Sequence, residues 1–179
     1  PENRLELRLV VNAGSILETE DQLGLAHFLE HMAFNGTKNF EKNEIVNYLQ
    51  SIGVRFGADL NAYTSFDETV YMLPIPTDND TIIDQGFQIL EDWAHNLTFD
   101  PEEIEKERGV VIEEWRLGQG ADRRMLDEFL PVLLRDSRYA ERLPIGTKEN
   151  LETFERSSLT NFYKDWYRPD LMAAVAVGD

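Results

Sequence analysis

The residues best suited to chemistry lie together at positions 27–31, which read His-Phe-Leu-Glu-His. On a helix, His27 and His31 are about one turn apart and point in nearly the same direction, so both imidazoles can bind one metal ion. Glu30 lies beside them but points elsewhere, which suits a base that takes a proton from a water on the metal. The spacing therefore predicts a catalytic zinc site, with two histidine ligands and Glu30 as the base.

A zinc site of this kind needs a third protein ligand. The sequence has no cysteine, and its other histidine, His95, is expected to pack near a helix end rather than to bind metal. A carboxylate is therefore expected, and Glu107 and Glu114 are the candidates. They lie on one face of an expected helix but about 10 Å apart along its axis, so only one of them can bind the ion. The apolar run at 110–112 favours Glu114 as the ligand and leaves Glu107 to orient a histidine or the helix.

Hydrophobic periodicity divides the chain into the strands and helices that would position these residues. Alternating apolar residues predict strands at 5–13, 54–64, 69–75 and 172–179, with a turn at 65–68. Apolar residues at helical spacing predict helices at 23–34, 42–50, 79–96, 101–117, 122–135 and 158–167. Strands at both ends with helices between them indicate the α+β class. We expect one antiparallel or mixed sheet packed against several helices, in a single domain that spans residues 1–179.

Individual residues predict where several elements begin and end. Asp21 is expected to cap the first helix, Gly36 and Gly53 to end the first and second helices, Pro101 to start the fourth helix, and Pro74 and Pro76 to end the third strand.

Composition excludes several classes of protein. The 179 residues include 34 acidic and 17 basic residues, a net charge of −17. This charge is opposite to that of nucleic-acid-binding proteins and does not suit adhesion to anionic membranes. No apolar run reaches the roughly 18 residues of a membrane-spanning helix, so membrane insertion is not expected. The chain begins and ends on expected strands, which leads us to expect a fragment of a longer, multidomain protein.

Three segments resemble signature motifs of the pitrilysin/insulinase family of zinc peptidases, in the family's order. They are His27–Thr37, Asn61–Tyr71 and Glu107–Glu114. The resemblance covers almost the whole chain and implies the fold of mitochondrial-processing-peptidase-type domains, which is similar to that of S-ribosylhomocysteine lyase.

The resemblance also implies roles for the matching residues. His27 and His31 would bind zinc, Glu30 would be the general base, and Glu114, the second glutamate of the pair, would be the third ligand. Glu107 would be a supporting acid of the catalytic site. The stretch between the histidines and Glu114 is longer than the family pattern, which leaves Glu113 as an alternative ligand.

The expected hairpin has its own interpretation. The part of its first strand at 59–64 could pair with an extended peptide through its backbone, or could be an ordinary sheet edge. The resemblance favours the first and implies that Asn61, Ala62 and Thr64 contact the substrate.

The resemblance implies a zinc-dependent endopeptidase with one Zn²⁺ per chain, acting on peptides or small unfolded proteins. The branch it most resembles consists of bacterial periplasmic zinc proteases, which implies the periplasm or cell envelope. Family members pair this domain with C-terminal homologous domains that help hold the substrate. We therefore expect the isolated chain to bind zinc but to cleave peptides weakly or not at all.

Two alternatives are less well supported. S-ribosylhomocysteine lyase also uses two histidines and a glutamate at this spacing, but it requires cysteines, which this chain lacks. A non-catalytic, peptide-binding homologue of the same family would have no reason to keep His27, Glu30, His31 and Glu114 together.

Overall fold

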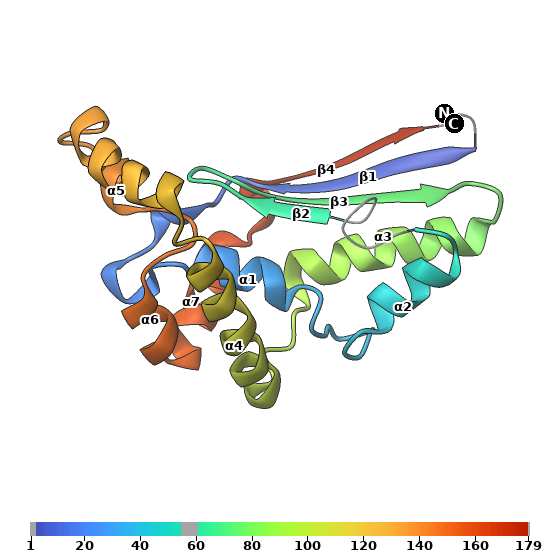
Figure 1. Cartoon of the computed structure of the whole chain (residues 1–179). Coiled ribbons are helices and arrows are strands. Elements are labelled where there is room, and N and C mark those ends of the chain that lie inside the picture. Colours follow the sequence, from blue (N-terminus) through green and yellow to red (C-terminus); the bar gives the residue numbers. More distant parts are fainter. Residues whose placement is uncertain (1–2, 55–60, 179) are drawn as a thin grey trace.

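A four-stranded sheet forms one layer of the molecule, and Figure 1 shows most helices on one side of it. The computed structural model describes residues 3–54 and 61–178. The strands are β1 (Arg4–Val11), β2 (Asn61–Thr64), β3 (Thr69–Pro76) and β4 (Met172–Gly178). They lie in the order β2-β3-β1-β4, and every neighbouring pair is antiparallel. The predicted α+β class with an antiparallel sheet is confirmed.

The described residues form seven α-helices and four short 3₁₀ segments. The α-helices are α1 (Leu25–Met32), α2 (Glu44–Ser51), α3 (Asp80–His95), α4 (Pro101–Leu117), α5 (Ala121–Leu133), α6 (Lys148–Thr153) and α7 (Arg156–Trp166). The 3₁₀ segments are η1 (Ser15–Leu17), η2 (Glu20–Gln22), η3 (Arg138–Glu141) and η4 (Pro169–Leu171). Six of the helices were expected. The short helix α6 was not, because it buries a single apolar residue, Leu151, and so shows no periodic pattern.

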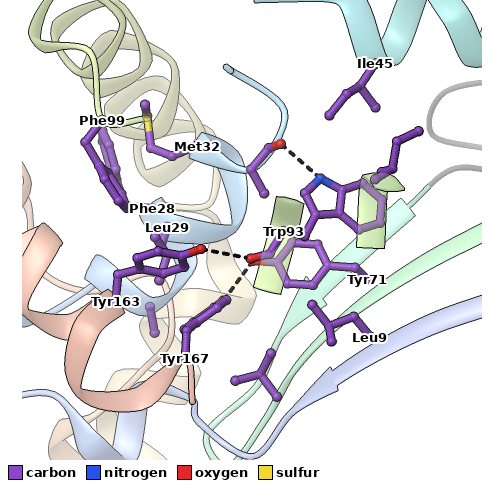
Figure 2. Packing of buried hydrophobic residues seen from close by; sticks show 14 of the residues in the cluster. Leu9, Phe28, Leu29, Met32, Ile45, Tyr71, Trp93, Phe99, Tyr163 and Tyr167 are labelled. Atoms are coloured by element: carbon purple, nitrogen blue, oxygen red, sulfur yellow. Dashed lines mark hydrogen bonds between the residues drawn. The ribbon is translucent and has the colours of Figure 1, made fainter. Parts of the chain in front are cut away.

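The core lies between the sheet and the helices, and Figure 2 shows its centre. Trp93 of α3 is fully buried, and its indole N–H donates a hydrogen bond of 3.0 Å to the carbonyl of Ala33, just past α1. Tyr71 of β3 stacks on Trp93, with ring centroids 5.1 Å apart, and its hydroxyl lies 2.7 Å from that of Tyr167. These contacts fix the C-terminal end of α1 between the sheet and α3.

Two predicted boundaries of the first helix are wrong. Helix α1 begins at Leu25, after Gly24 in the left-handed conformation, and Asp21 instead lies inside η2, whose N-cap is Thr19. The helix ends at Met32, so Gly36, with φ of +134°, lies in the following loop and is not the cap. Local sequence patterns predicted both ends wrongly because tertiary contacts fix them: the contact of Trp93 with Ala33 at the C-terminal end, and contacts of Glu18, described below, at the N-terminal end.

The other boundaries divide between confirmed and corrected predictions. Gly53 follows α2 with φ of +86°, and Pro101 starts α4, both as expected. Strand β3 ends at Pro76, as expected, but Pro74 lies inside it; the two prolines are opposite Arg4 and Glu6 of β1. Strand β2 pairs with β3 only as far as Met72, so both prolines lie where the described residues of β3 form a sheet edge, and there a missing N–H is tolerated. Of the strand expected at 54–64, residues 55–60 lie outside the described residues.

Candidate metal centre

Helix α1 presents its two histidines to one point, as their spacing predicts. The Nε2 atoms of His27 and His31 are 3.3 Å apart, and the two rings meet edge to face with centroids 4.7 Å apart. Two ligands about 2.0–2.1 Å from a tetrahedral zinc ion lie about 3.3 Å from each other. The two imidazoles are therefore spaced as a pair of zinc ligands.

Helix α4 crosses α1 and supplies a carboxylate to the same point. The Oε1 atom of Glu114 lies 3.7 Å from Nε2 of His27, and its Oε2 atom lies 3.4 Å from Nε2 of His31. One ligand atom from each of the three residues lies within 4.8 Å of the others. Two imidazole nitrogens and one carboxylate oxygen are a donor set that fits zinc and leaves a fourth position open.

Glu107 lies on the other side of the His31 ring. Its Oε1 atom is 2.7 Å from Nδ1 of His31, and its Oε2 atom accepts a 2.7 Å hydrogen bond from the side-chain amide of Asn35. An Nδ1–H donated to Glu107 leaves Nε2 of His31 free to face the metal position. This is the arrangement expected when Glu107 orients a histidine and Glu114 completes the donor set.

The electrostatic surroundings of the two histidines differ. Burial, together with the neighbouring His31, lowers the pKa of His27 to about 4, so its ring is neutral at pH 7. Burial also disfavours the charged form of His31, but the hydrogen bonds with Glu107 and Glu114 outweigh it and raise its pKa to about 9.

Glu30 lies on the same helix, next to the metal position but outside the donor set. Burial raises the pKa of Glu30, and a 2.6 Å hydrogen bond from the hydroxyl of Thr64 opposes that rise. A buried glutamate with a raised pKa, close to a metal position, is a candidate general base.

A pocket of about 450 Å³ opens beside these residues. Its lining residues come from α1 and the loop after it, from the N-cap and first turn of α2, from β2 and from α4. They are Glu30, His31, Phe34, Asn35, Asn43, Val46, Asn61, Ala62, Glu107 and Val110. The pocket has mixed apolar and amide walls, and both Glu30 and Glu107 face it.

The three residues expected to contact substrate are placed differently from one another. Asn61 and Ala62 of β2 line the pocket, whereas the hydroxyl of Thr64 points to Glu30. Within the described part of the chain, β2 pairs with β3 alone and is the last strand of the sheet. The predicted strand at 59–64 is thus described only from Asn61 onward.

Two residues that the sequence left open lie away from the metal position. Glu113 forms an ion pair with Arg116, one turn along α4, with a shortest N–O distance of 2.5 Å. His95 is exposed near the end of α3, with Nε2 3.6 Å from a carboxylate oxygen of Glu91. Neither belongs to the group of possible metal ligands found among the described residues.

Sequence reasoning missed the residue that holds the N-terminal end of α1. The buried side-chain carboxyl group of Glu18 accepts hydrogen bonds of 3.0 Å from the backbone N–H of Gly24 and 2.8 Å from that of Ala26. These are two of the N–H groups that a helix start leaves without an intrahelical partner. Glu18 precedes the helix by seven residues, so no capping pattern could have identified it.

Comparisons with known proteins identify the family of the chain. The family model described as insulinase, peptidase family M16, matches residues 1–137. The chain belongs to the insulinase family of peptidases. It is 41% identical to "Probable zinc protease PqqL" of Haemophilus influenzae, and the match covers all of this chain and 19% of that protein. It therefore spans about a fifth of the length of that relative.

Solved structures of the family have the same fold. The crystal structure of the first half of the periplasmic protease PqqL from Escherichia coli superimposes with a TM-score of 0.95, at 41% identity, over all of this chain and 38% of that one. A ferredoxin protease, FusC, superimposes with a TM-score of 0.90 at 31% identity, over all of this chain and 20% of that chain. Pitrilysin, at 24% identity and a TM-score of 0.82, shares the fold over 98% of this chain and 19% of its own.

The described residues include no helix that is long and apolar enough to cross a membrane.

Proposed function

We propose that this chain is the zinc-binding, N-terminal domain of a metalloendopeptidase that cleaves peptides or small unfolded proteins. One Zn²⁺ would be held by His27, His31 and Glu114. The observation that carries the proposal is that these three residues, from two helices far apart in sequence, bring their ligand atoms within 4.8 Å of one another.

The chain's own residues account for the steps of hydrolysis. When bound, zinc would polarise the scissile carbonyl and acidify the attacking water. Glu30 takes the proton from that water and delivers it to the leaving amine. Thr64 keeps the carboxylate of Glu30 in one orientation through its 2.6 Å hydrogen bond. Glu107 fixes the ring of His31, so the ligand does not rotate away from the ion.

Substrate binding is proposed at β2 and the adjoining pocket. An extended peptide that pairs with the backbone of β2 would pass Asn61 and Ala62 on its way across the metal position. The pocket, of about 450 Å³, is large enough to accept a substrate side chain. Backbone pairing contributes affinity with little dependence on sequence, which suits an enzyme for varied peptides.

The complete enzyme is proposed to include further domains. The chain matches about a fifth of the Haemophilus relative, and the relative of known structure is called periplasmic, so we propose C-terminal homologous domains and a location in the bacterial periplasm. The isolated chain is expected to bind zinc but to cleave weakly, because the remaining domains contribute to holding the substrate.

The test separates metal binding from chemistry. Zinc per chain is measured after zinc loading and dialysis, and peptide cleavage is measured in the longest natural form of the protein. Glu30→Gln should keep one zinc per chain and lose cleavage, while the control Glu113→Gln, whose side chain pairs with Arg116, should change neither. Cleavage at the wild-type rate by Glu30→Gln would show that the base is another group. Zinc binding without cleavage by the wild-type protein would favour the non-catalytic, peptide-binding alternative.

A further inference from the structure

We propose that Asn35 is a positioning residue of the metal centre, which acts on the zinc ligand His31 through Glu107. The inference rests on the proposed zinc site. Its starting point is that the side-chain amide of Asn35 bridges two elements: Nδ2 donates 2.7 Å to Oε2 of Glu107 on α4 and lies 3.3 Å from the carbonyl oxygen of His31 on α1.

The amide completes the contacts of Glu107. One carboxylate oxygen of Glu107 contacts Nδ1 of His31 and the other accepts from Asn35, each at 2.7 Å. Two contacts on opposite oxygens fix both the position and the rotation of the carboxylate, whereas one contact leaves it free to turn about its last bond. The side chain of Glu107 is 15% exposed, so water has limited access to replace a missing partner.

The loop that carries Asn35 is itself anchored. Asp92 of α3 is fully buried, and its carboxylate accepts hydrogen bonds from the hydroxyl of Thr37 at 2.5 Å, from the backbone N–H of Asn39 at 3.1 Å and from the side-chain amide of Asn39 at 2.7 Å. The loop is thereby tied to the same helix whose Trp93 holds the end of α1. Asp92 thus fixes the path of the backbone just after Asn35. The loop is held in one conformation, in which the side-chain amide of Asn35 lies against Glu107.

These contacts form one connected path from the core to the metal position. It runs from Asp92 through the loop to Asn35, then to Glu107 and to His31. Removing a group that hydrogen-bonds to a metal ligand and orients it typically weakens metal affinity about 10–100-fold. Asn35 stands one step further from the metal than Glu107, so the lower end of that range is expected.

The experiment measures zinc affinity of this chain by competition with a chromophoric chelator. Asn35→Ala should weaken zinc binding about tenfold. Asn35→Asp should weaken it further, because it removes the donor and sets a second carboxylate against Glu107. The control Lys38→Ala, an exposed position in the same loop, should leave the affinity within twofold.

A double-mutant cycle distinguishes action through Glu107 from a general loosening of the loop. In a Glu107→Ala background, Asn35→Ala should cause no further loss of zinc affinity, because the group it positions is absent. The visible spectrum of the Co²⁺-substituted chain should change in Asn35→Ala and in Glu107→Ala alike. Unfolding by urea in the presence of chelator should show that the metal-free variant keeps the wild-type stability within about 1 kcal/mol.

Each outcome decides the inference. An Asn35→Ala affinity within twofold of wild type, or losses that multiply in the double variant, would overturn the role of Asn35 and leave the zinc site standing. A wild-type chain that binds no zinc, with no change in His27→Ala, would overturn the zinc site and the role of Asn35 together.

Discussion

Replacing Glu18 with glutamine should make the stability of the protein less dependent on pH. The side chain of Glu18 is buried and accepts backbone hydrogen bonds from Gly24 and Ala26, at the start of the helix that carries the histidines. Burial raises its pKa from 4.5 to about 8, although those hydrogen bonds and the nearby guanidinium of Arg142 act in the opposite direction. Glu18→Gln keeps the size of the side chain and cannot ionise.

The sign and size of the effect follow from the pKa in the two states. In the unfolded chain Glu18 ionises near pH 4.5, and in the folded chain near pH 8, so folding takes up a proton between these values. The contribution of Glu18 to stability is complete below about pH 4.5 and is lost as pH rises through about 8. Each pH unit in that window corresponds to about 1.4 kcal/mol. Between pH 5 and pH 8, the wild type should therefore lose about 3 kcal/mol relative to Glu18→Gln.

Urea unfolding of both proteins at pH 5, 6, 7 and 8 measures this difference, with chelator present so that metal binding does not contribute. The control Glu152→Gln removes an exposed acid that pairs with Lys148, away from Arg142, and should reproduce any effect of net charge alone. If the stability of wild type minus that of Glu18→Gln stays constant or rises with increasing pH, the reasoning is refuted. That result would show that the backbone hydrogen bonds and Arg142 outweigh burial, and that the start of α1 is held by an ionised carboxylate.

Four further outcomes are expected. Burial disfavours the ionised form of Asp92, but the hydrogen bonds that its carboxylate accepts outweigh burial and lower its pKa below 3.8. In thermal melts between pH 5 and 2.5, the wild type should lose stability as pH falls through that lowered pKa, and Asp92→Asn should lose less. Thr64→Val should lower cleavage by the longest natural form about tenfold, because one hydrogen bond to Glu30, the proposed base, is lost. Zinc affinity should stay within twofold of the wild type, and Thr64→Ser should recover cleavage. Gly146→Ala should cost more than about 2 kcal/mol in urea unfolding, because its Cβ would lie 2.5 Å from the Cα of another glycine, whereas Gly53→Ala, also at positive φ but in open space, should cost about 1 kcal/mol. Zinc at about 100 times its dissociation constant should stabilise the wild type by about 2.7 kcal/mol in thermal melts, an effect that chelator or His27→Ala removes.

Much of the candidate site was predictable because its geometry is local. A helix places residues four apart on one face whatever surrounds it, so the pair His27 and His31 and the different direction of Glu30 follow from spacing alone. The same argument shows that Glu107 and Glu114 cannot share one ion. The alternation of β1 and the periodicity of the longer helices likewise predicted the α+β class.

The choice between the two glutamates depends on how α4 crosses α1, which spacing cannot give. The structure sets Glu114 beside both Nε2 atoms and Glu107 behind the ring of His31. Spacing fixed the separation along α4, but only the crossing of two helices determines which end meets the histidines.

The sequence by itself determined the chemical groups available, namely two imidazoles and the carboxyl groups of Glu30, Glu107 and Glu114 on helices of known periodicity. Only the tertiary structure decided how these groups are held. Glu18 reaches the start of α1 from outside any capping pattern, and Asn35 reaches Glu107 across 72 positions of sequence. Such contacts leave no local signal, because hydrogen bonding between distant segments depends on the packing of the whole core rather than on the period of any one element.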